Sequence, residues 1–226
     1  PFILSRDEAY IGVLIDDLIT KGTKEPYRMF TSRAEYRILL RQDNADIRLS
    51  KKAFDLKLLD QVKFDKVSRK IDESLKLNRY VRSLSIKPSE INDLLKEKNS
   101  SPITQKVKAH SIISRPNIHI KDILDNSEGL KEFMSNIKLK KEALEQTEIQ
   151  IKYNGYIKRE KDNADKIKRL EHVMIPEDID YTKFSSLSTE SKEKLNFIRP
   201  KDIGQASRIS GIKPSDISIL LIYLGR

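Results

Sequence analysis

The scarcity of glycine and of alternating apolar and polar residues is the feature that most constrains the fold of this chain. Only 7 of its 226 residues are glycine, and runs with a two-residue alternation are rare. Half-buried strands show that alternation, whereas amphipathic helices repeat apolar residues every three or four positions. We therefore predict an all-α protein, a multi-helix bundle with a compact C-terminal helical subdomain.

Composition divides the chain into three parts. Residues 1–50 carry 8 basic and 8 acidic groups, whereas residues 51–100 carry 13 basic groups against 8 acidic ones. We predict a helical bridge at 1–50, a helical middle region at 51–145 and a C-terminal helical subdomain at 146–226.

Two helix starts share one pattern. The stretches "IKPSEINDLL" at 86–95 and "IKPSDISILL" at 212–221 each have proline, serine and an acid in sequence. Proline suits the first turn because the N–H it lacks has no partner there, and an acid suits the positive end of the helix dipole. We read a shared start signal rather than a domain repeat, because the flanking residues do not match.

Other elements follow from periodicity and from breakers. A polar loop is expected at 96–110 and a long charged helix at about 131–173, in which Gly155 indicates a bend or a close backbone approach. Near the N-terminus, helical spacing predicts a helix that ends near Gly22. Its apolar positions are Ala9, Val13, Leu14 and Leu18.

Arginines and aromatic residues interleave between positions 25 and 49. Ser32 and Glu35 form a capping-box pattern, so a second helix is predicted there, with Arg33, Arg37 and Arg41 on one face. Arginine suits phosphate, and aromatic rings suit bases, but nearby acids could equally pair with these arginines internally. The candidate phosphate-binding residues are Arg28, Arg33, Arg37, Arg41, Arg48, Lys51 and Lys52.

The remaining chemistry is sparse. The net charge of +10 favours an acidic partner such as RNA, and the absence of cysteine excludes disulfides, thiolate metal sites and a cysteine nucleophile. Three scattered histidines do not indicate a metal site, and Asp16 and Asp17 favour a structural role. Tyr153 and Tyr156 share a helix face, where core packing is the default and base stacking the alternative.

The two ends of the chain carry further expectations. The longest apolar run, "ISILLIYL", is far shorter than the roughly 20 residues of a membrane span. The N-terminus lacks both an initiator methionine and a signal peptide, so we expect a piece of a longer cytoplasmic protein. The apolar last helix is either buried in the bundle or offered to a partner.

Two long motifs resemble one known family. The stretch from "AYIGVLIDD" to "NADIRL" resembles the segment that follows the FAD-binding core in the GidA/MnmG family. "YNGYIKRE" and "IGQASRISGIKPSDISILLIYL" are similar to the C-terminal helical domain of that family, in the same order. The resemblance runs over the whole chain, densest at 9–49 and 151–224.

The resemblance implies a function for the longer protein. Members of the family are flavoproteins that modify the wobble uridine of tRNA with a GTPase partner, MnmE, and they use FAD, NADH and a methylene-folate donor. Because this chain has no Gly-x-Gly-x-x-Gly motif and no cysteine, we expect it to bind no cofactor and to be non-catalytic by itself. Residues 1–50 are then expected to pack on the upstream FAD-binding domain.

Within that resemblance, this part serves tRNA docking and recruitment of the GTPase, and homodimerisation of the longer protein stays open. The arginine and lysine set above becomes the predicted tRNA surface. The predicted partner-binding residues are Arg208, Ile217, Leu220, Leu221, Tyr223 and Leu224. The alternative is a purely structural or protein-binding module that makes no direct tRNA contact.

Overall fold

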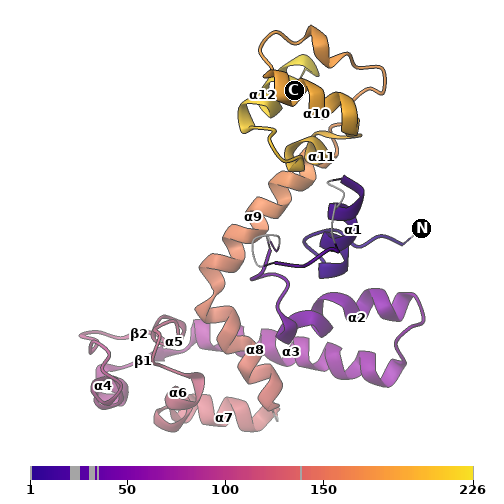
Figure 1. Cartoon of the computed structure of the whole chain (residues 1–226). Helices are drawn as coiled ribbons and strands as arrows, with labels where there is room; N and C mark the ends of the chain where they lie inside the picture. The colour runs from indigo at the N-terminus through magenta and orange to yellow at the C-terminus, as the bar shows by residue number, and fades with distance from the viewer. Residues whose placement is uncertain (1, 21–25, 31–33, 35, 138, 226) are drawn as a thin grey trace. The chain divides into compact units, whose positions relative to one another are not determined.

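The computed structural model describes residues 2–20, 26–30, 34, 36–137 and 139–225 (Figure 1). It is helical apart from one small sheet, which confirms the predicted all-α fold class. The chain forms two compact units, one of residues 41–158 and one of residues 1–40 together with 159–226. Their boundaries lie after Leu40 and after Lys158, whereas the sequence placed its boundaries near 50 and 145.

The unit of residues 41–158 is built from seven α-helices, a 3₁₀ turn and two short strands among its described residues, with an eighth helix beginning at its end. In chain order these are η2 (Gln42–Asn44), α2 (Ala45–Asp55), α3 (Gln61–Ser83), β1 (Ser85–Ile86), α4 (Pro88–Glu97), β2 (Val107–Lys108), α5 (Ala109–Ile113), α6 (Ile120–Asn126), α7 (Glu128–Ile137), α8 (Lys141–Lys152) and the start of α9 (Asn154–Glu171).

Helix α3 is the centre of this unit and packs on α2, α5, α7 and α8. Leu77 and Val81 of α3 are fully buried in a core of aliphatic side chains that extends to Ile151 of α8. Within this contact Ser74 and Thr147 share a buried hydrogen bond, 3.0 Å between their hydroxyl oxygens. Pairing the two hydroxyls removes the penalty of leaving either one buried without a partner.

The small sheet was not predicted from the sequence. β1 and β2 pair antiparallel, with Ser85 opposite Lys108 and Ile86 opposite Val107. The polar loop expected at 96–110 therefore ends at Val107, where β2 begins. The side chain of Asn92 holds the backbone of this loop in place. That amide accepts from the N–H of Ile103 (2.8 Å) and donates to its carbonyl oxygen (3.0 Å).

The second unit combines an N-terminal segment with the C-terminal helices. Its described elements are α1 (Tyr10–Thr20), the remainder of α9, η3 (Tyr181–Lys183), α10 (Thr189–Ile198), α11 (Ile203–Arg208) and α12 (Pro214–Tyr223). The helices predicted after both Lys-Pro-Ser sequences are confirmed, because α4 and α12 each begin at the proline. None of the described helices combines the length and the apolar character that a membrane span needs.

The C-terminal helices enclose their own core. Tyr181, Leu195, Ile203 and Leu220 are fully buried in it, and Ser188 caps α10 by accepting the N–H of Ser191. Asp216 links two helices, because its carboxylate accepts both the N–H of Lys213 (2.9 Å) and the hydroxyl of Ser191 (2.8 Å).

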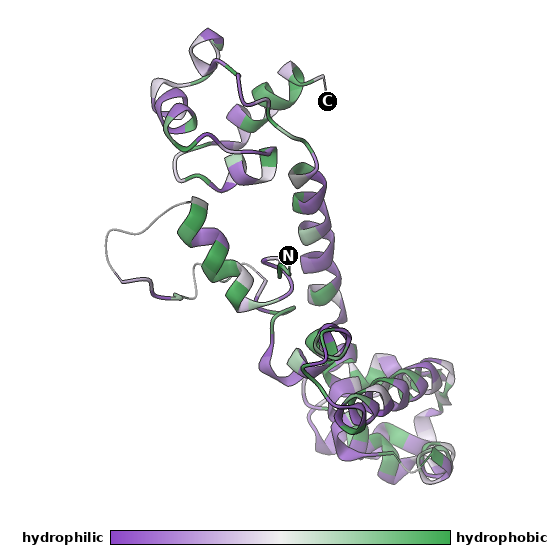
Figure 2. Ribbon diagram, turned by 90° about the vertical axis from the view of Figure 1, so that its right-hand side faces the viewer, coloured by the Kyte–Doolittle hydropathy of each residue, from purple (hydrophilic) through white to green (hydrophobic). Residues whose placement is uncertain are grey.

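Helix α1 depends on a glycine in its first turn. A Cβ at Gly12 would collide with the carbonyl oxygens of Leu4 and Ser5, so only glycine lets the backbone of residues 4–5 pack this closely against α1. Much of α1 is green in Figure 2, which marks apolar residues. Ile11, Ile15 and Ile19 are 49–71% exposed there, whereas Val13 is fully buried.

Two predicted helices differ from the structure. The long helix expected at 131–173 is three helices, α7, α8 and α9, with breaks at 139–140 and at Tyr153. Lys140 turns the chain there because its N–H donates to the carboxylate of Glu73 on α3, 3.1 Å away. The helix expected from Ser32 is wrong for its described part, since residues 36–40 form a turn and the next α-helix, α2, begins only at Ala45.

Candidate nucleic-acid interface

The described arginines among the predicted phosphate-binding residues fall into two groups. Arg28 and Arg37 are exposed, and Arg33 lies outside the described residues. Arg41 and Arg48 are partly buried in the other unit. Because residues 36–40 form a turn rather than a helix, the four-residue spacing does not place these arginines on one helix face.

Arg41 and Arg48 are engaged in local contacts. The guanidinium of Arg41 binds both carboxylate oxygens of Asp43, with its Nε 3.0 Å from Oδ1 and an Nη 3.2 Å from Oδ2. Arg48 donates to the side-chain oxygen of Asn44 (2.9 Å) and to the carbonyl of Arg41 (3.3 Å). These two arginines therefore pair with residues of the chain itself, and their hydrogen bonds hold the start of α2 in place.

Lys51 and Lys52 follow on α2. Lys51 is 78% exposed and pairs with Asp55 one turn later, a contact of 3.2 Å between solvated groups. Such exposed pairs hold their partners weakly, so Lys51 remains available to a phosphate. Lys52 is partly buried, and it also interacts with another residue of the chain.

A buried ion cluster that the sequence did not reveal joins α1 to α11. Arg6 donates to Asp16 and Asp17, each at 2.8 Å, and Arg208 contacts Asp16 at 3.0 Å. The hydroxyl of Tyr27 donates to Asp17, also at 2.8 Å. This cluster gives Asp16 and Asp17 a structural role, and it engages the partly buried Arg208, which was a predicted partner-binding residue.

Two further contacts hold the N-terminal segment to α9. Glu160 accepts the backbone N–H groups of Ile38 and Leu39, each at 3.1 Å, so a helix carboxylate fixes the turn that follows Arg37. Lys168 lies 2.7 Å from Asp7, and this hydrogen bond raises the pKa of the lysine. Sequence spacing could not find these pairs, because their members stand more than 120 positions apart.

The predicted partner-binding residues of α12 divide between core and surface. Ile217 and Leu220 are 8% and 0% exposed, so the core of the C-terminal helices holds them. Leu221 and Leu224 are partly buried, and Tyr223 is 64% exposed beside Ile222, which is 75% exposed. The exposed large apolar side chains of α12 therefore lie in its last turn.

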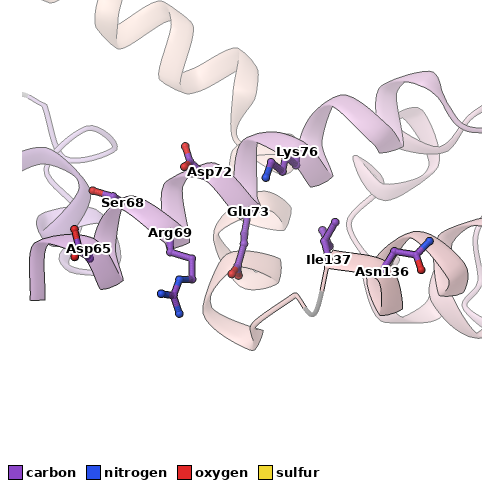
Figure 3. A pocket seen from close by; sticks show the side chains of 8 residues that line it. All are labelled: Asp65, Ser68, Arg69, Asp72, Glu73, Lys76, Asn136 and Ile137. Atoms are coloured by element: carbon purple, nitrogen blue, oxygen red, sulfur yellow. The ribbon is translucent and has the colours of Figure 1, made fainter. Parts of the chain in front are cut away.

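The hollow in Figure 3 has a volume of about 520 Å³, and its walls are mostly polar. Glu73 points into it from α3, and its carboxylate is already bound to the N–H of Lys140. The other lining residues are Asp65, Ser68, Arg69, Asp72, Lys76, Asn136 and Ile137. No described group of histidines and acids has the arrangement of a metal site.

Comparisons with known proteins agree along the chain. Residues 61–161 match a family model described as the tRNA modifying enzyme MnmG/GidA C-terminal helical domain, and residues 163–226 match the C-terminal helical bundle of the same enzyme. The chain thus has the fold of the helical C-terminal part of a tRNA-modifying enzyme. It belongs to the MnmG/GidA family.

Individual relatives support the same assignment. The tRNA uridine 5-carboxymethylaminomethyl modification enzymes MnmG of Christiangramia forsetii and Flavobacterium psychrophilum are 55% and 52% identical over 100% of this chain. The chain spans 36% of the length of each. Two crystal forms of Aquifex aeolicus GidA superpose with TM-scores of 0.73 and 0.70 at 38% and 39% identity, covering 100% of this chain and 34% and 33% of theirs.

Proposed function

We propose that this chain docks tRNA and recruits an MnmE-type GTPase for a flavin-dependent enzyme that modifies the wobble uridine. One observation carries the tRNA part: Arg28 and Arg37 are exposed in a basic chain that belongs to a family of tRNA-modifying enzymes. Guanidinium groups bind phosphates in a planar, bidentate manner, and Glu160 holds the backbone next to Arg37 in place.

The flavin chemistry belongs to the longer protein in this proposal. FAD, NADH and the methylene-folate donor bind outside these residues, and the exposed apolar face of α1 packs on the flavin-binding domain. That face consists of Ile11, Ile15 and Ile19, together with Phe2 and Ile3 beside it. Covering it would remove apolar surface from water, which stabilises the association. A cytoplasmic location follows from a tRNA substrate.

Fluorescence anisotropy of a labelled anticodon stem-loop, titrated with the 226-residue chain at two salt concentrations, tests tRNA docking. We expect the Arg28→Ala/Arg37→Ala variant to bind about ten-fold more weakly and to reduce the salt slope by about two phosphate contacts. Lys183→Ala/Lys201→Ala is the matched control, since it removes two exposed charges from the same unit.

Each outcome has a distinct meaning. If the arginine variant binds like the wild type, the RNA surface lies elsewhere, and the Lys51 and Lys52 stretch is tested next. If the folded wild-type chain binds no stem-loop, tRNA docking is refuted. Salt-tolerant binding to the GTPase alone would then favour the alternative, a module that binds only proteins.

Recruitment of the GTPase rests on the exposed last turn of α12. Ile222 and Tyr223 are apolar groups in contact with solvent, and such residues become anchors when a partner covers them. We expect Ile222→Asp to weaken binding to the GTPase by at least ten-fold in a surface plasmon resonance titration. Leu58→Asp is the control, because Leu58 is 79% exposed in the other unit; equal losses in both variants would contradict the assignment.

A further inference from the structure

Tyr153 and Tyr156 lie outside the core, at the break between α8 and α9. They are 46% and 57% exposed, and neither ring joins the buried clusters of the described chain. The two ring centroids are 6.4 Å apart with the planes tilted by 52°. Core packing, the default interpretation of their spacing, therefore does not account for these two rings.

The backbone holds this pair in a fixed position. The N–H of Tyr153 donates to the carbonyl of Ile149 at the end of α8, and its own carbonyl accepts the N–H of Ile157 in α9, both at 2.9 Å. Because hydrogen bonds on both sides fix the residue, the rings are presented from a rigid turn and lose little backbone freedom when a ligand binds.

Gly155 lies between the two tyrosines, and neither its backbone conformation nor its packing requires a glycine there. Glycine is unfavourable in a helix relative to alanine, and it is kept where the backbone needs a positive φ or where another atom approaches closely. Gly155 is not among the glycines with positive φ, and a Cβ placed on it would have no described heavy atom within 4 Å. The open space beside the rings is thus free for something outside the described chain.

Positive charge borders this space. Lys158 is exposed and stands three positions after Gly155, so it lies on the same side of α9. Lys152 precedes the pair, but its ammonium is already held by the carbonyl of Pro116 at 3.1 Å and by the carboxylate of Glu148 at 3.4 Å, so Lys158 is the charge that remains for a ligand. Exposed aromatic rings on a helix that also presents an exposed lysine suit a ligand that combines aromatic faces with negative charge, as a nucleic acid does.

We propose that Tyr153 and Tyr156 form a stacking platform for unpaired bases of RNA, with Gly155 leaving room for the sugar-phosphate backbone and Lys158 facing a phosphate. This inference rests on the proposed function, since it requires that the chain bind tRNA. Unpaired bases are the expected ligand because the bases of a duplex are already stacked on each other.

The test compares a labelled anticodon stem-loop with a fully paired RNA duplex of the same charge, each titrated with the 226-residue chain. We expect Tyr153→Leu/Tyr156→Leu to lower affinity for the stem-loop by about ten-fold or more and to leave the duplex affinity unchanged, since stacking on one base changes affinity by about five- to 150-fold. Tyr153→Phe/Tyr156→Phe keeps the aromatic faces and should bind like the wild type.

Gly155→Ala gives a second and independent readout. The added methyl group should leave the chain equally or more stable to heat, yet it should weaken stem-loop binding because it fills the space beside the rings. If both the leucine and the alanine variants bind the stem-loop as tightly as the wild type while the wild type binds well, the platform is refuted and tRNA docking stands. If the wild type binds no RNA, both proposals fail. A loss confined to protein-partner binding would assign the tyrosines to a protein interface and overturn the stacking platform.

Discussion

Glu148 is a residue whose ionisation contributes to the fold of residues 41–158. Its carboxylate is 2.6 Å from Nδ1 of His119 and 3.4 Å from Nζ of Lys152, and it accepts the N–H of Ile120 at 2.9 Å. Burial by itself would raise the pKa of Glu148, but these three partners together lower it below its ordinary value.

The lowered pKa predicts how acid acts on this residue. A carboxyl whose pKa is lower in the folded state stabilises the fold above its unfolded pKa, about 4.5, and this contribution is lost as pH falls through the folded value. We expect Glu148→Gln to destabilise the chain by about 1–2 kcal/mol at pH 7, and the difference to shrink below pH 4.5. Urea unfolding at several pH values measures it. Glu145→Gln, an exposed position on the same helix, should change little; a pH-independent loss for Glu148→Gln would contradict the assignment.

At the scale of elements, neighbouring residues determine where some helices begin, whereas contacts between distant residues determine where others begin. Pro88 and Pro214 mark helix starts that depend only on neighbouring residues, so the sequence predicts both correctly. The break before α8 depends on Glu73, which stands 67 positions from Lys140, and no local pattern carries that information. For the same reason the ion cluster of Arg6 and Arg208 could not be predicted. The sequence did predict that Tyr153 and Tyr156 form a pair, but it did not predict that both rings are exposed.

The two similar helix starts make a matched comparison. Glu90 of α4 accepts the N–H of Lys87 in an exposed setting, at 2.7 Å. Asp216 of α12 accepts the equivalent N–H of Lys213 and also the hydroxyl of Ser191, and it is only 4% exposed. Removing Asp216 leaves the buried hydroxyl of Ser191 and the partly buried N–H of Lys213 without their acceptor, so we expect Asp216→Ala to cost about 2–3 kcal/mol and Glu90→Ala about 0.5–1 kcal/mol. Thermal unfolding of both variants measures the difference, and equal losses would show that burial does not decide it.

At the scale of the whole molecule, the two units have separate cores. One core runs from Leu77 to Ile151 and the other from Ile175 to Leu220, and the two buried clusters share no residue. Proteins often open in cooperative parts that coincide with such cores, so stability need not be uniform along the chain. The sequence indicated several helical parts, but it did not pair the N-terminal segment with residues 159–226, because that pairing depends on contacts between distant residues.

Two core substitutions test this division. Leu77 and Leu195 are both fully buried, one in each core, so Leu77→Ala and Leu195→Ala should each destabilise their own unit by about 2–5 kcal/mol. Amide hydrogen exchange is the measurement. We expect Leu77→Ala to lower protection in α3, α5 and α8 while α10 and α12 keep theirs, and Leu195→Ala to do the reverse. Loss of protection throughout the chain in both variants would show that the two cores unfold as one cooperative unit, because each core would then depend on the other for its stability.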